Sequence, residues 1–177
     1  MKKRLDLAKT IRSIPDFPKP GILFRDITTL IQDKVAFRQA VDAIVAKFKK
    51  KKVDLVVAVE ARGFIFGGAV AHRLGAGFVP VRKKGKLPWK TKSVTYELEY
   101  RTDTLEIHQD AVPEGARVLI VDDLLATGGT VKAVTNLLES LGAKIVGIAF
   151  VIELFDLNGR QKLAKYPVVS LVKFPGH

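Results

Sequence analysis

The chain has 177 residues, enough for one domain with a buried core. It contains no cysteine, which excludes disulfides and cysteine-based metal sites or nucleophiles, and its 30 basic against 18 acidic residues give a formal net charge of +12. No apolar stretch is long enough to cross a bilayer and the first ten residues lack a secretory segment, so we expect a cytoplasmic protein with no membrane partner.

The predicted elements alternate between strands and helices along the chain. An extended, proline-rich lead at 14–22 comes first, and the continuous apolar run at 53–59 is typical of a strand buried on both faces. Further strands are predicted at 77–83, 118–121, 144–154 and 167–173, an extended segment at 94–109, and helices at 34–50, 64–74, 131–141 and 158–165. The alternation predicts an α/β fold class with a central, mostly parallel twisted sheet flanked by helices.

One run, VLIVDDLLATGGT at 118–130, joins a strand, two carboxylates, a glycine loop and a helix N-terminus. Gly128 and Gly129 lack a Cβ atom, so the backbone can approach a ligand closely. The loop N–H groups and the helix dipole attract an anion, while Asp122 and Asp123 accept hydrogen bonds from hydroxyls. A ribose 5-phosphate satisfies both halves. The alternative is a strand end followed by an ordinary turn, which explains each half alone but not their combination.

The basic charge raises nucleic acid as a partner. However, Lys47 and the lysines at 49–52 fall at a predicted helix C-terminus, where cations are favoured. The sequence also lacks the interleaved aromatic and basic residues that stack single-stranded bases. We therefore expect a polyanionic small substrate rather than a nucleic acid. His72, His108 and His177 are too scattered for a metal site, so no protein metal ligands are expected.

The 118–130 run resembles the phosphoribosyl-diphosphate-binding motif of the type I phosphoribosyltransferases. Other segments are similar to the adenine phosphoribosyltransferases of that family and occur in the same order: FPKPGILFRDIT (17–28), VEARGF (59–64), VRKKGKLP (81–88), YELEY (96–100), TLEIH (104–108) and FPGH (174–177). The resemblance implies a purine salvage enzyme that transfers the phosphoribosyl group of 5-phosphoribosyl 1-diphosphate to adenine, giving AMP and diphosphate. It also implies a homodimer, and Mg²⁺ bound mainly through the diphosphate and ribose hydroxyls.

The same resemblance implies a single phosphoribosyltransferase domain over 1–177. An N-terminal arm and base-binding hood would occupy 1–33, and an α/β core of 34–177 would include a mobile lid at 82–105. Arg101 stands where the family usually has glycine, which bears on the flexibility of that lid.

If the family's residue roles apply to this chain, the ribose would lie between two aspartates and the backbone of the glycine loop. Asp122 and Asp123 would bind its 3- and 2-hydroxyls and favour the positive charge that develops on the ring as diphosphate leaves. The loop backbone would bind the 5-phosphate, through Ala126, Thr127, Gly128, Gly129 and Thr130.

The diphosphate would be bound by Arg62 and Gly63, with Lys83 and Lys86 reaching it from the lid. The family's diphosphate loop also implies a cis peptide bond at about Glu60–Ala61. On the fragment alone, a strand-end turn with an exposed arginine is the commoner outcome, and the resemblance reverses that preference.

The base would lie under the hood. Main-chain groups of Leu23 would read the N1 acceptor and the amino donor of adenine, Phe24 and Leu124 would sandwich the ring, and Arg25 would reach it or its neighbour. Simple core packing is a strong alternative for Phe24. The donor and acceptor that the main chain of Leu23 would present to the base disfavour bases with a carbonyl at the six-position.

In the lid, Glu99 would approach the imidazole edge of the base as a general acid–base, and Tyr100 would assist closure. An exposed strand carboxylate is an equally good interpretation of Glu99. Two other functions stay open from the sequence. One is transfer to another base, such as hypoxanthine, guanine, xanthine or orotate, and the other is a phosphoribosyl-diphosphate-sensing regulator that binds nucleic acid.

Overall fold

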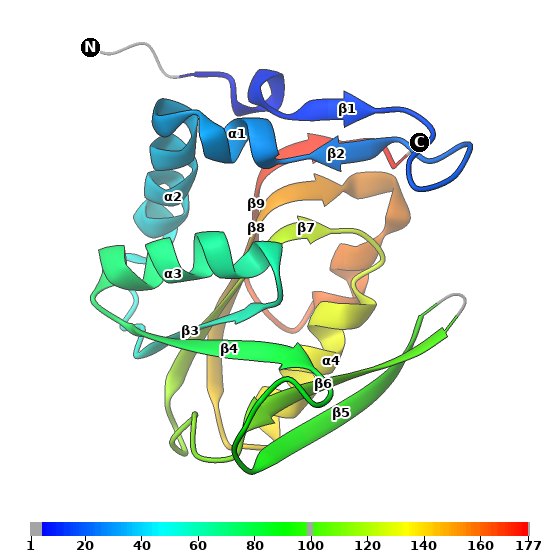
Figure 1. The fold of residues 1–177 in the computed structure, drawn as a ribbon. Coiled ribbons are helices and arrows are strands. Elements are labelled where there is room, and N and C mark those ends of the chain that lie inside the picture. Colours follow the sequence, from blue (N-terminus) through cyan, green and yellow to red (C-terminus); the bar gives the residue numbers. More distant parts are fainter. Residues whose placement is uncertain (1–4, 99–100, 177) are drawn as a thin grey trace.

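The computed structural model describes residues 5–98 and 101–176 and has a seven-stranded sheet at its centre (Figure 1). The strands are β3 (Leu55–Val59), β4 (Gly77–Lys83), β5 (Thr91–Leu98), β6 (Arg101–His108), β7 (Arg117–Leu125), β8 (Lys144–Leu154) and β9 (Val168–Phe174). Their order is β5-β6-β4-β3-β7-β8-β9. All neighbours from β4 to β9 in that order are parallel, whereas β6 pairs antiparallel with both β4 and β5. The predicted α/β fold class is confirmed.

Helices cover both faces of the sheet. The α-helices are α1 (Thr28–Gln32), α2 (Lys34–Phe48), α3 (Arg62–Leu74) and α4 (Gly129–Glu139), and the 3-10 helices are η1 (Leu7–Thr10), η2 (Phe155–Leu157) and η3 (Gly159–Leu163). One apolar core contains residues of η1, α1, α2 and α3, and the other contains residues of α4 and η3. A small antiparallel sheet of β1 (Arg12–Ile14) and β2 (Phe24–Asp26) lies at the top of the view in Figure 1, beside α1.

The central strands divide their side chains between these two cores because successive residues of a strand point to opposite faces. Val56 of β3 and Leu119 of β7 pack into the core under α2 and α3. Their neighbours Val57 and Ile120 pack into the core that contains α4. A strand with two buried faces must be apolar at consecutive positions, which explains the continuous apolar runs in the sequence.

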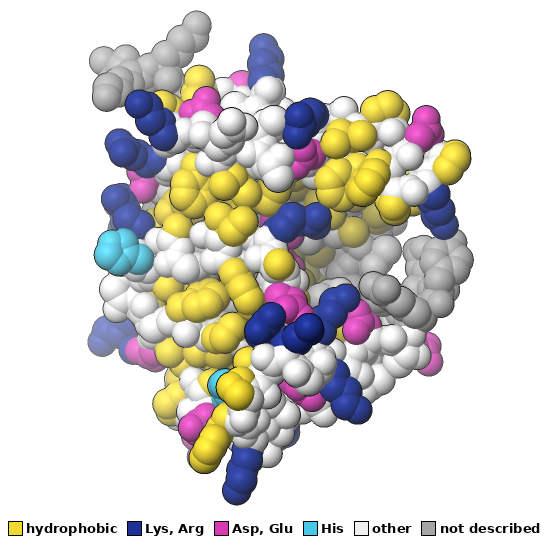
Figure 2. All heavy atoms as spheres, viewed as in Figure 1, with side chains coloured by type: hydrophobic (Ala, Val, Ile, Leu, Met, Phe, Trp, Pro, Cys, Tyr) yellow, Lys and Arg dark blue, Asp and Glu magenta, His cyan; other side chains and the backbone are white. Residues whose placement is uncertain are grey.

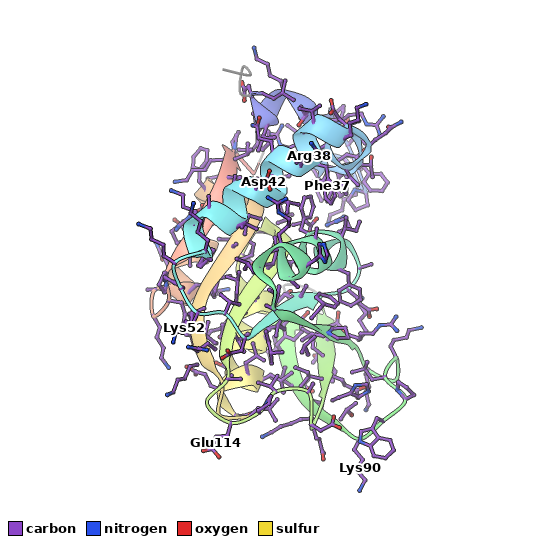
Figure 3. All side chains as sticks on the ribbon, turned by 90° about the vertical axis from the view of Figure 1, so that its left-hand side faces the viewer. Phe37, Arg38, Asp42, Lys52, Lys90 and Glu114 are labelled. Atoms are coloured by element: carbon purple, nitrogen blue, oxygen red, sulfur yellow. The ribbon has the colours of Figure 1, made fainter. Side chains whose placement is uncertain are left out.

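Helix α2 packs on α3 through both apolar and charged contacts (Figure 3). The rings of Phe37 and Phe66 lie 5.6 Å apart between their centroids, and Arg73 forms an ion pair with Asp42 at 2.7 Å. The Asp33 side chain begins α2 by accepting hydrogen bonds from two of its first N–H groups. These contacts fix α3, whose N-terminus borders the cavity described below.

Several elements differ from the prediction in extent or type. Strand β7 continues to Leu125, so Asp122 and Asp123 lie within the strand rather than after it. The extended segment expected at 94–109 is an antiparallel hairpin of two strands, and the helix expected at 158–165 is a 3-10 helix. Within the described residues, the structure contains no helix of the length and apolarity needed to span a membrane.

A buried carboxylate joins the ends of β8, η3 and β9. Glu153 is 4% exposed and accepts hydrogen bonds from Arg160 Nε at 2.9 Å and Nη2 at 2.5 Å. Ser170 Oγ donates to the same carboxylate at 2.5 Å. The guanidinium of Arg160 lowers the pKa of Glu153 to about 2, and the Ser170 hydroxyl assists, while burial opposes the shift. This network ties three elements with one bidentate ion pair.

The network predicts how stability depends on pH. A carboxyl group with a depressed pKa stabilises the folded state above its unfolded pKa, about 4.3 for glutamate, and loses that contribution as the pH falls toward about 2. We therefore expect the wild type to be more stable than Glu153→Gln at pH 7, and the difference to shrink between about pH 5 and pH 2. Urea unfolding at several pH values measures it. A difference that stays constant through that range would contradict the assignment.

Candidate active site

A cavity of about 720 Å³ lies at the carboxyl ends of β3 and β7, where ligands bind in parallel sheets of this kind. Its walls come from three parts of the chain that are distant in sequence. The lining residues are Val59, Glu60, Ala61, Arg62, Lys83, Asp122, Asp123, Leu124, Leu125, Ala126, Thr127, Gly128, Gly129, Thr130 and Val131. Most predicted binding residues for ribose, 5-phosphate and diphosphate are therefore together. Gly63 and Lys86 are not among the lining residues.

Two helix N-termini meet at this cavity. Helix α3 begins at Arg62 and α4 begins at Gly129, and neither receives a capping hydrogen bond from the side chain of its N-cap residue. The first N–H groups of a helix have no partner inside the helix, and the helix dipole is positive at this end. The cavity therefore offers two separate places that favour an anionic group.

Glycine is required at two positions of these N-termini. Gly128 has φ +77°, and a Cβ there would lie 2.5 Å from the carbonyl oxygen of Gly159. At Gly63, a Cβ would lie 2.6 Å from Asp122 Oδ1. Gly63 thus acts behind the cavity wall, where its missing side chain lets α3 approach the carboxylate.

The two carboxylates differ in their electrostatic environment. Asp122 accepts a hydrogen bond from the backbone N–H of Asp123 at 2.9 Å, while Asp123 Oδ2 accepts one from Arg62 Nε at 2.5 Å. Burial raises the pKa of Asp122 well above its usual value, and the negative charge of Asp123 raises it further. A second negative charge is therefore unfavourable at this site unless a bound cation or hydroxyl donors stabilise it.

Comparison with known proteins agrees with this geometry. Residues 28–175 match the model of the phosphoribosyl transferase domain. The chain belongs to the phosphoribosyltransferase family. It is 59% identical to the adenine phosphoribosyltransferase of Clostridium acetobutylicum over 170 residues, which cover 96% of this chain and 99% of that protein. It is 60% identical to the adenine phosphoribosyltransferase of Methylobacterium nodulans over 173 residues, covering 97% and 96%.

Solved structures of the family are also similar to this phosphoribosyltransferase. The adenine phosphoribosyltransferase of Thermoanaerobacter pseudethanolicus has a TM-score of 0.92 at 56% identity, with 96% of this chain and 98% of that chain covered. The enzyme of Giardia lamblia, solved with 9-deazaadenine, has a TM-score of 0.91 at 36% identity and 96% coverage of both chains.

The loop between β3 and α3 contains the predicted cis peptide bond at Glu60–Ala61. No role was predicted for Glu60 from the sequence, but its carboxylate joins β3 to β4. Arg82 donates to Glu60 Oε2 from Nε at 3.1 Å, and the backbone N–H of Lys83 donates to Oε1 at 2.7 Å. The sequence feature that could have indicated this role is the position of Glu60, an acidic residue directly after a buried strand. Glu60 therefore fixes the start of the predicted lid.

The β5–β6 hairpin reaches the start of α4. Tyr96 Oη lies 3.3 Å from Thr130 Oγ1, and Lys83 Nζ lies 3.6 Å from Asp103 Oδ2. Glu99 and Tyr100 lie outside the described residues, so their roles stay predictions. The Lys86 side chain is exposed and its carbonyl accepts a hydrogen bond from Arg82.

Among the predicted base-binding residues, Leu124 lines the cavity, whereas Phe24 is not among the lining residues. The Arg62 guanidinium lies 5.6 Å from the Phe24 ring centroid. Leu23 is half-buried and directly precedes β2.

Arg25 differs from these residues, because its side chain forms hydrogen bonds with other parts of the chain. It donates to Ser13 Oγ at 2.6 Å and to the Pro175 carbonyl at 3.3 Å, and it stacks 4.3 Å above the Phe174 ring. Arg25 therefore fastens β2 to the C-terminal segment, and direct contact with the base stays a prediction.

Proposed function

We propose that this phosphoribosyltransferase transfers the 5-phosphoribosyl group from 5-phosphoribosyl 1-diphosphate to adenine, giving AMP and diphosphate in purine salvage. The observation that carries this proposal is the convergence of two uncapped helix N-termini and two aspartates on one cavity. A phosphorylated sugar diphosphate has two anionic ends separated by hydroxyls, and this arrangement is complementary to it. The choice of adenine is supported by relatives that are named adenine phosphoribosyltransferases.

In this proposal, each wall of the cavity binds one part of the substrate. The N–H groups at 126–130 bind the 5-phosphate, and the N-terminus of α3 with Arg62 binds the diphosphate. Asp122 and Asp123 accept the ribose hydroxyls and stabilise the positive charge that forms on the ring when the bond to diphosphate breaks. Phe24 and Leu124 enclose the base. Glu99 handles the proton that adenine loses, and Tyr100 assists lid closure.

Mg²⁺ fits this donor set as part of the substrate complex. Magnesium prefers oxygen ligands, keeps several waters, and is commonly held through substrate phosphates and one or two carboxylates. The cavity presents two adjacent carboxylates, Asp122 and Asp123. When bound, the ion would be held mainly by oxygens of the substrate and would neutralise charge on the leaving diphosphate.

The test is incubation of the protein with 5-phosphoribosyl 1-diphosphate, Mg²⁺ and a panel of bases, with each nucleotide product measured. AMP from adenine, and little product from hypoxanthine, guanine, xanthine or orotate, is the expected result. Folded protein that makes no nucleotide from any base would contradict the transferase. Efficient turnover of a six-carbonyl base would contradict the choice of adenine.

Replacement of Arg62 with methionine should raise the KM for 5-phosphoribosyl 1-diphosphate about tenfold to a hundredfold, because a charge-assisted hydrogen bond contributes about 1.5–3 kcal/mol. The KM for adenine should change much less. Steady-state kinetics with each substrate varied in turn measures both values.

Arg73→Met is a matched control, because Arg73 belongs to the same helix and forms an exposed ion pair with Asp42. An exposed pair contributes little to stability, so Arg73→Met should stay folded. Arg62→Met leaves the buried carboxylate of Asp123 without its arginine, so its folding is checked by circular dichroism before the kinetics. A variant at Arg62 whose KM for the diphosphate substrate equals that of the control would contradict the assigned role.

We also infer a cytoplasmic homodimer. Hydrophobic side chains gather on the face formed by α3 and β4 (Figure 2), where Ile65 is 42% and Phe78 is 38% exposed. Exposed apolar groups of this kind mark protein interfaces when they are contiguous. Sedimentation equilibrium decides the oligomeric state, and a monomer at micromolar concentration would contradict the dimer.

A further inference from the structure

The loop that we assign to the 5-phosphate rests on the backbone of η3. A Cβ atom on Gly159 would overlap the carbonyl oxygen of Ala126 and would lie 2.8 Å from the Gly128 nitrogen. In the opposite direction, a Cβ on Gly128 would lie 2.5 Å from the Gly159 carbonyl oxygen. Two glycine backbones are therefore in direct contact. Any displacement of Gly159 must move the loop or open a gap beneath it.

Gly159 is held in place by the residue that follows it. Arg160 donates four hydrogen bonds to three acceptors: two to the Glu153 carboxylate, one from Nη1 to the Val168 carbonyl at 2.9 Å, and one from Nη2 to Ser170 Oγ at 2.9 Å. These acceptors belong to β8 and β9, which are paired neighbours in the central sheet. The planar guanidinium is thus fixed in orientation as well as position.

The same network connects to the loop through the sheet. Glu153 of β8 is the register partner of Leu125 in β7, and Leu125 directly precedes the loop residue Ala126. The loop is therefore held from two directions, by its own strand and by η3 beneath it. Each support involves one member of the Glu153–Arg160 ion pair, although Arg160 itself does not line the cavity.

We propose that Arg160 is a positioning residue that, with Glu153 and Ser170, holds Gly159 against the phosphate loop so that the loop N–H groups face the 5-phosphate. This inference rests on the proposed function, because it assigns the 5-phosphate to residues 126–130. A lysine cannot replace the guanidinium here, since it offers one point charge where the fork reaches three acceptors. Hydrogen-bond donors misplaced by about 1 Å lose much of their effect on a bound group.

The proposal is tested by calorimetric binding of three ligands to the intact protein. AMP and ribose 5-phosphate both carry the 5-phosphate, whereas diphosphate binds at the other helix N-terminus. Arg160→Met should weaken the binding of AMP and of ribose 5-phosphate about tenfold, and the affinity for diphosphate should change by no more than about twofold. In steady-state assays, the same variant should raise the KM for 5-phosphoribosyl 1-diphosphate while the KM for adenine stays nearly constant. Arg160→Lys should recover only part of the affinity.

Arg117→Met is the matched control. Arg117 forms a bidentate pair with Asp54 at 2.9 and 2.6 Å, at the opposite end of β7 from the loop. This variant should lose stability but bind all three ligands like the wild type. Ser170→Ala keeps the bidentate pair and should weaken AMP binding only about twofold to threefold. If Arg160→Met does not fold, this smaller loss of AMP affinity tests the positioning role instead.

Equal weakening of AMP and diphosphate in Arg160→Met, or an effect no larger than that of Arg117→Met, would overturn the positioning role. Failure of the proposed function is recognised separately. It would appear as wild-type protein that makes no AMP, whereas the positioning role is judged from ribose 5-phosphate binding, which needs no turnover.

Discussion

Replacement of Asp123 with asparagine should lower kcat for AMP formation about a hundredfold or more, the size of effect seen when one transition-state contact is removed from an active site. The amide oxygen still accepts a hydrogen bond from a ribose hydroxyl. It carries no charge, however, and so cannot stabilise the positive ring that forms as diphosphate leaves. The measurement is the initial rate at saturating adenine and 5-phosphoribosyl 1-diphosphate.

The fold should survive this change. Asparagine has nearly the same volume, and removal of one of two adjacent negative charges relieves the repulsion that raises the pKa of Asp122. Asp54→Asn is the control, because Asp54 also binds an arginine but at the other end of the sheet. Circular dichroism and urea unfolding should report two folded proteins, of which only the Asp123 variant is inactive. Full activity in that variant would remove the ribose role from Asp123.

Gly128→Ala should abolish measurable binding of 5-phosphoribosyl 1-diphosphate. A Cβ atom in the left-handed conformation costs about 1–2 kcal/mol, and here it would also meet the Gly159 carbonyl oxygen at 2.5 Å. Since the collision is with backbone, the loop must shift, and its N–H groups would no longer converge on the phosphate. Calorimetric titration with the substrate measures the loss.

Gly115→Ala separates strain from collision. Gly115 has φ +76°, nearly the same as Gly128, but a Cβ there would meet nothing within 4 Å. Both variants should therefore lose about 1–2 kcal/mol of stability from the backbone conformation, and only the Gly128 variant should lose substrate binding. Equal affinity in the two variants would show that the close approach of Gly128 to Gly159 is unimportant for the site.

The parts of the fold that follow from short-range patterns could be predicted from the sequence. Continuous apolar runs such as 53–59 predicted buried parallel strands, and the glycine loop with its helix N-terminus at 128–131 was located within two residues. The approach of Asp122, Asp123 and Arg62 to one cavity also followed, because parallel strands place their carboxyl ends at one edge.

What the sequence could not reveal depends on contacts between distant segments. The hydrogen bonds of Arg25 run to Ser13 and Pro175, and Pro175 lies 150 residues away, so no local pattern announces that contact. Gly159 was overlooked for the same reason, since its importance comes from the shape of the loop above it. Asn158, which precedes it, has φ 54°, whereas the sequence predicted a helix that begins at this position.

The ion pair between Arg62 and Asp123 has a consequence for how their contributions combine. Each side chain already satisfies the other, so a substrate that engages both must first separate them, and binding becomes an exchange of partners rather than a simple gain of contacts. Removing either side chain leaves the other without its ion-pair partner. The losses of substrate binding free energy measured for the two single variants should therefore not sum to that of the double variant. The two halves of the cavity are in this sense energetically linked.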